Sequence, residues 1–97
     1  MSIPIARVGD IATGICRAHK YPIPVTGVIA NGSPSVTVDG LPLARVGDVV
    51  TFDCGHTGVI ISGLNTGQVD GKIIAHIGSL VVGPMQAVII KGSPTTG

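Results

Sequence analysis

The sequence has 97 residues, enough for one small domain, and its 15 Gly and 7 Pro residues disfavour long helices. Charged residues make up 11% of the chain and the formal net charge is +1, which excludes the strongly basic surface that bulk nucleic-acid binding needs. The mean hydropathy is positive, but every apolar run is far shorter than the about 18 residues of a membrane-spanning helix, so we expect the apolar residues in strands.

Two short motifs alternate along the chain, and each occurs three times. The first is IARVGD at 5–10, LARVGD at 43–48 and IAHIGS at 74–79. The second is rich in β-branched residues and occurs as GVIANGSP at 27–34, GVIISGLN at 58–65 and AVIIKGSP at 87–94. This alternation predicts three similar units built from β-strands.

Two Asp-Gly pairs, Asp39-Gly40 and Asp70-Gly71, separate the second motif from the next copy of the first and favour tight hairpin turns. The chain begins with a returning half-unit at 3–10 and ends with an outgoing half-unit at 87–95, so the third unit is complete only if the termini meet. We therefore predict an all-β fold, a small cone or prism of short β-hairpins with pseudo-threefold repeats, as a single domain over residues 1–97.

A domain of this size without many aromatic residues needs an additional source of stability. The only aromatic residues are Tyr21 and Phe52, so Val, Ile, Leu and Ala must form a core that is small for its surface. A metal, a disulfide or a partner protein can supply the missing stability. The sequence from Met1 to Pro4 does not resemble a signal peptide, so we expect synthesis in the cytoplasm and no structural disulfide.

The ionisable residues do not predict catalysis. The acidic residues are five Asp and no Glu, and Asp10 and Asp48 occupy equivalent repeat positions where a side-chain acceptor closes a turn. Asp53, His56 and a serine (Ser62 or Ser79) have the residue types of a Ser-His-Asp catalytic triad, but the sequence around these serines is not a nucleophile elbow. We expect a protein that is not an enzyme.

Sulfur and imidazole side chains indicate a metal site. Cys16 and His19 lie in the loop after the first copy of the first motif, Cys54 and His56 lie in the equivalent loop after the second, and Met85 holds the corresponding third position. Thiolate and imidazole ligands from separate loops suit one tetrahedral structural Zn²⁺. A buried, purely apolar role for each cysteine is the simpler alternative. The metal-ligand candidates are five residues: Cys16, His19, Cys54, His56 and His76.

The first motif extends to PIARVGD at 4–10 and PLARVGD at 42–48, and GSPSVTVDG at 32–40 precedes the second copy. In these residues the chain resembles the PAAR-repeat family over nearly its whole length. The third copy, IIAH at 73–76, lacks the Pro and the Arg. The resemblance implies a cone of short strands on the blunt end of a trimeric β-helical spike, one chain per trimer, in contractile phage tails or type VI secretion. The cone sharpens the spike, makes transient contact with the target membrane and in some systems binds effector proteins.

The resemblance also implies a zinc site made of three His and one Cys. His19, His56 and His76 are then the histidines and Cys54 the favoured sulfur, whereas the repeat favours Cys16 as the fourth ligand, so both sets stay open. Two alternative functions stay open too: a small metal-dependent hydrolase of envelope material with Asp53 as general base, and a metal-free adaptor that attaches effectors to the spike. We expect assembly into a virion tail tip or a secretion-apparatus tip, without a fused toxin domain.

Overall fold

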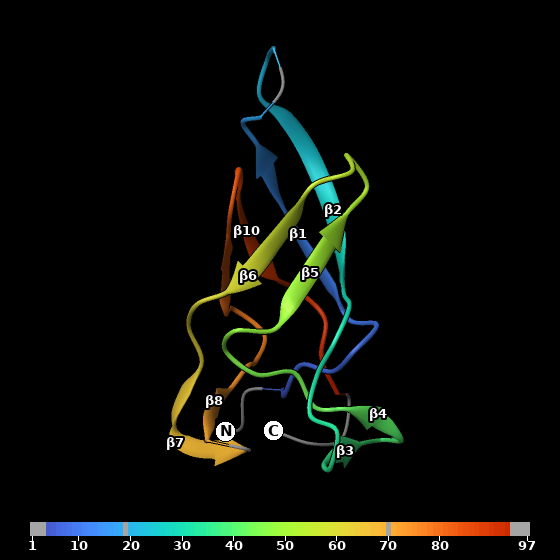
Figure 1. Ribbon diagram of the computed structural model, residues 1–97, viewed down its shortest axis with the longest axis vertical. Helices are drawn as coiled ribbons and strands as arrows, with labels where there is room; N and C mark the ends of the chain where they lie inside the picture. Colours follow the sequence, from blue (N-terminus) through green and yellow to red (C-terminus); the bar gives the residue numbers. More distant parts are fainter. Residues whose placement is uncertain (1–3, 19, 70, 94–97) are drawn as a thin grey trace.

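The computed structural model describes residues 4–18, 20–69 and 71–93 and contains strands but no helices in these ranges (Figure 1). The ten strands are β1 (Ile11–Cys16), β2 (Ile23–Ile29), β3 (Thr37–Val38), β4 (Leu41–Pro42), β5 (Val49–Phe52), β6 (Thr57–Ile60), β7 (Leu64–Val69), β8 (Lys72–Ile74), β9 (Leu80–Val82) and β10 (Met85–Ile89). The predicted all-β fold class is confirmed. In the part of the chain that the structure describes, no helix is long and apolar enough to cross a membrane.

Six strands close an antiparallel barrel in the order β1-β10-β9-β6-β5-β2. The barrel consists of three hairpins, β1–β2, β5–β6 and β9–β10, and each hairpin pairs with the other two. Two further hairpins, β3–β4 and β7–β8, lie at the wide end of the molecule (Figure 1). The molecule measures 39 × 25 × 23 Å and narrows towards the β1–β2 hairpin, which extends furthest along the long axis (Figure 1).

The barrel strands alternate between buried and exposed residues, as the period of two in a β-strand requires. In β2, for example, Val25, Gly27 and Ile29 face inward and the residues between them face outward. The interior is narrow: a Cβ atom at Gly14 would lie 2.0 Å from the carbonyl oxygen of Gln86, and one at Gly27 would lie 2.7 Å from the Phe52 ring. Glycine at these positions therefore lets neighbouring strands and the one core aromatic ring pack closely.

Three equivalent segments form a ring of backbone hydrogen bonds below the barrel. The amide of Ala6 donates to the carbonyl of Ala75, Ala75 donates to Ala44, and Ala44 donates to Ala6, each over 3.0 Å. All three alanines are fully buried. The ring confirms the predicted pseudo-threefold arrangement, and it explains why the repeat has alanine at this position, since larger side chains would not fit where three segments meet.

The two ends of the chain complete the third unit. The amide of Ser93 donates to the carbonyl of Ile5 over 2.8 Å, and the equivalent bond within the continuous chain runs from Ser33 to Leu43 over 2.8 Å. The side chain of Ser93 also donates to Asp39, which stands in the β3–β4 turn. That turn has positive φ at both central residues, 53° at Asp39 and 80° at Gly40, as predicted for Asp-Gly. Asp70 of the second predicted turn lies outside the described residues.

Two of the three ring segments end in an Arg–Asp ion pair. The carboxylate of Asp10 accepts the amide of Arg7 over 2.8 Å and its Nε over 3.0 Å, and Asp48 accepts the same two groups of Arg45 over 2.8 and 3.1 Å. In the third segment, Ser79 Oγ accepts the amide of His76 over 2.9 Å. The hydrogen bond to Asp10 raises the pKa of the Arg7 guanidinium, so Arg7 stays charged at any ordinary pH. The turn-closing role predicted for Asp10 and Asp48 is therefore confirmed.

Candidate metal centre

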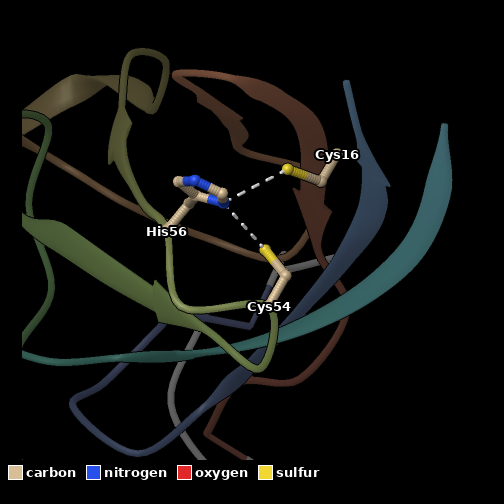
Figure 2. Close-up of side chains that lie close together, drawn as sticks. All are labelled: Cys16, Cys54 and His56. Atoms are coloured by element: carbon tan, nitrogen blue, oxygen red, sulfur yellow. Dashed lines mark hydrogen bonds between the residues drawn. The ribbon is translucent and has the colours of Figure 1, made fainter. Parts of the chain in front are cut away.

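Three of the five predicted ligands lie together near the narrow end of the barrel. Cys16 is the last residue of β1, and Cys54 and His56 lie in the turn between β5 and β6. Strand β2 separates β1 from β5 in the barrel order, so the site joins two hairpins that are far apart in sequence. Figure 2 shows both sulfur atoms directed at the same nitrogen of the His56 ring.

The ligand atoms are close enough to share one ion. Cys16 Sγ lies 3.8 Å from His56 Nδ1, and Cys54 Sγ lies 3.5 Å from the same nitrogen (Figure 2). All three ligand atoms lie within 4.8 Å of one another. Cys16 is fully buried, whereas Cys54 and His56 are half-buried. Both cysteines are free thiols in this structure.

These distances fit a tetrahedral metal ion. With bonds of about 2.3 Å to sulfur and about 2.05 Å to nitrogen, a tetrahedral zinc ion separates a sulfur and a nitrogen ligand by about 3.6 Å. The observed values of 3.5 and 3.8 Å lie on either side of that separation. Thiolate sulfur and imidazole nitrogen are also the ligand atoms that zinc prefers. The three residues can therefore hold a metal ion.

Backbone hydrogen bonds hold the β5–β6 turn in place. Phe52 donates its amide to the carbonyl of His56 over 2.9 Å, and Gly55 donates to the carbonyl of Phe52 over 3.0 Å. The turn is also tied to β2, because the amide of Asp53 donates to the Thr26 carbonyl over 3.0 Å and Asp53 Oδ1 accepts the Thr26 amide over 3.2 Å. The carboxylate of Asp53 is thus hydrogen-bonded to β2. It does not belong to the group of Cys16, Cys54 and His56, which we call the metal-ligating group because it could hold an ion.

Met85 occupies the third repeat position inside the core. It is the cross-strand partner of Cys16 between β10 and β1, and it is almost fully buried. A Cβ atom built at Gly58 would lie 2.9 Å from its Sδ, so the thioether fills the space that this glycine leaves. Met85 therefore packs beside the buried thiol in one hydrophobic cluster that also contacts Cys54.

The structure places the remaining two candidates differently. His76 lies in the ring below the barrel, where it forms a β-bridge with Ile5 and its Nδ1 donates to the carbonyl of Ile77. It is not a member of the metal-ligating group. The physical reason is its repeat position: His76 is equivalent to Arg7 and Arg45, both of which stand in the same ring. His19 lies outside the described residues.

The repeat explains why the two cysteines lie together. Equivalent positions of Cys16 and Cys54 predict that both thiols lie at the same end of the barrel, and the structure brings them together. In the same repeat, His76 is equivalent to Arg7 and Arg45. This equivalence is the feature of the sequence that indicates a position in the ring for His76. The three-histidine set with one cysteine thus differs from the described group of two cysteines and one histidine.

Comparison with known proteins identifies the family. No curated protein matches the chain significantly. A family model for the PAAR motif matches residues 1–55, which include the first two copies of the repeat motif, Cys16 and Cys54. The match covers more than half of the chain, and its residues build two of the three ring segments and two of the three groups in the cluster. Because the match covers more than half of its residues, this chain belongs to the PAAR-motif family.

Proposed function

We propose that this protein is a structural spike tip that caps a trimeric β-helical spike, one chain per trimer, and sharpens it for passage through a target envelope. The observation that carries the proposal is the ring of Ala6, Ala44 and Ala75, because it gives a single chain an approximate threefold axis. A surface with approximate threefold symmetry can make similar contacts with each subunit of a trimer. Membership of the PAAR-motif family supports the same role.

The distribution of charge supports a cap that binds through its wide end. None of the residues in the six barrel strands is charged. The wide end carries the ion pairs of the ring and exposed apolar side chains, among them Val36 and Leu41 at 37% and 39% exposure. Apolar residues beside hydrogen-bonding groups are typical of a protein interface. The uncharged barrel wall suits transient contact with a membrane, and effector proteins remain further candidate partners.

The proposal includes one structural Zn²⁺ held by Cys16, Cys54 and His56. His19, three residues after Cys16, is the candidate for the fourth ligand. A fully ligated ion with soft ligands would stabilise the tip and leave no open position for a substrate. We assign no catalytic role to the chain, and the engagement of Asp53 with β2 supports this, since a general base must reach the reacting group.

We further propose that the chain is made in the cytoplasm and assembled into a virion tail tip or a secretion-apparatus tip.

The test is the stoichiometry of a complex with a trimeric β-helical spike protein from the same source. Native mass spectrometry should give one chain per three spike subunits, and a ratio of one to one would contradict the proposal. Leu41→Asp at the wide end should weaken the complex at least tenfold, because it places a charge in the proposed interface. Tyr21→Asp, at a tip residue with 68% exposure, is the matched control and should leave binding unchanged.

A further inference from the structure

The two thiols of the metal-ligating group differ in their exposure and in the space around them. Cys16 is fully buried and sits in β1, paired with Ile23 of β2 on one side and Met85 of β10 on the other. Cys54 is half-buried and sits in the β5–β6 turn. In that turn the space beside Gly55 is open, since a Cβ atom there would meet nothing within 4 Å. One sulfur is therefore fixed and shielded, and the other is accessible on a short turn.

We propose that Cys16 and Cys54 form a reversible disulfide under oxidation by a peroxide. This covalent bond then replaces the metal ion as the link between the β1–β2 and β5–β6 hairpins. The inference deepens the proposed function, because it rests on the metal site assigned there. Two sulfurs within 4.8 Å of each other need to approach by less than 3 Å to reach a disulfide length of about 2.05 Å. Rotation of the half-buried Cys54 side chain supplies this approach, while the backbone hydrogen bonds of the β5–β6 turn and the pairing of β1 keep both backbones in place.

The chemistry assigns a different step to each cysteine. The accessible thiolate of Cys54 attacks a peroxide oxygen, the O–O bond breaks, and the products are a sulfenic acid on Cys54 and a hydroxide, which takes up a proton as water. The shielded thiolate of Cys16 then attacks the Cys54 sulfur, the S–S bond forms, and hydroxide leaves and takes up a proton as water. In sum, two thiolates, one hydrogen peroxide and two protons give one disulfide and two waters. The sulfurs lose two electrons and the peroxide gains them.

Oxidation removes two of the three described ligands at once. His56 and the candidate ligand His19 then remain, and two neutral imidazoles hold the ion far more weakly than the full set, so the ion is released as the disulfide forms. The link between the β1–β2 and β5–β6 hairpins persists, because Cys16 and Cys54 lie on the same two hairpins that the metal would join. The tip would thus remain cross-linked both in a reducing cytoplasm and in an oxidising environment outside it.

The experiment titrates the metal-loaded, reduced protein with hydrogen peroxide and measures three quantities: free thiols, released zinc and intact mass. We expect two thiols lost and one zinc ion released per chain, a mass decrease of two hydrogens, and full reversal by a dithiol reductant. Non-reducing electrophoresis should show a monomer. Persistence of both thiols, oxidation of both to sulfonic acids, or a disulfide between chains would overturn the inference.

Three single variants separate the possible failures. Cys16→Ser should stop at oxygenated forms of Cys54, with a mass increase, whereas in Cys54→Ser the shielded Cys16 should react at least tenfold more slowly than Cys54 does. His56→Ala removes a proposed metal ligand but neither sulfur, so it should still form the disulfide. If the native chain binds no zinc yet forms the disulfide, the zinc assignment fails and the dithiol pair stands.

Discussion

At the scale of single residues, the Arg–Asp pair shows how far the repeat could be interpreted from sequence. Equivalent positions predicted that Asp10 and Asp48 close turns, and both do so. The burial of Arg45 beside its carboxylate was not predictable, because a long cationic side chain in a short motif normally points into solvent. Only the ring brings three such segments together and encloses Arg45, which is 8% exposed.

Removing the carboxylate of Asp48 should strongly destabilise the protein. The side chains of Arg45 and Asp48 are 10% and 3% exposed, and loss of one member of such a buried pair costs about 3 kcal/mol or more because the other charge stays desolvated. Urea denaturation of Asp48→Ala should show this loss. The control is the double variant Arg45→His with Asp48→Ser, which copies the third segment. The double variant should lose less stability than Asp48→Ala, because it leaves no unpaired buried charge. An equal loss of stability in both variants would contradict this explanation.

At the scale of elements, the candidate metal centre depends on how the hairpins pack against each other. The sequence placed Cys16 and Cys54 at the same end because they follow equivalent strands. It could not show that Cys16, at the end of β1, is brought next to the β5–β6 turn, since that contact depends on the closure of the barrel through β2. Nor did the number of histidines reveal their positions, and His76 lies in the ring instead.

Metal content should distinguish the two described histidines. His56→Ala should reduce bound zinc from one ion per chain to well below one, because it removes the nitrogen at which both sulfurs converge. His76→Ala is the matched control and should keep one ion. Elemental analysis measures both. A chelator should lower the thermal midpoint of the native chain and of His76→Ala, and equal zinc in all three proteins would reject the assigned site.

At the scale of the whole molecule, the two ends of the chain complete the architecture. The sequence predicted this closure from its two complementary half-units, and the bond from Ser93 to Ile5 confirms it. The unequal hairpins were less predictable. The repeat implies three similar units, but β1 and β2 have 6 and 7 residues whereas β5 and β6 have 4 each, and the difference sets which hairpin forms the tip.

A chain that ends at Gly92 should be less stable than the native chain. It loses the backbone bond from Ser93 to Ile5 and the side-chain bond from Ser93 to Asp39, both at a residue that is 1% exposed. Two such bonds contribute about 2 kcal/mol together. Thermal and urea unfolding should detect the loss. Ser93→Ala should show an intermediate effect and Lys91→Ala, at an exposed neighbour, almost none; no effect of truncation would show that the closure is dispensable.

The ring of alanines also explains why one chain, rather than three identical subunits, suits a pointed object. A homotrimer must place three copies of every loop around its axis, so its end is blunt and any ion on the axis has ligands in multiples of three. Repeats within one chain are free to diverge. Here one hairpin alone occupies the point, and two cysteines and a histidine form a group that threefold symmetry forbids. Symmetry is kept at the wide end, where the proposed trimeric partner would bind, and is lost at the tip.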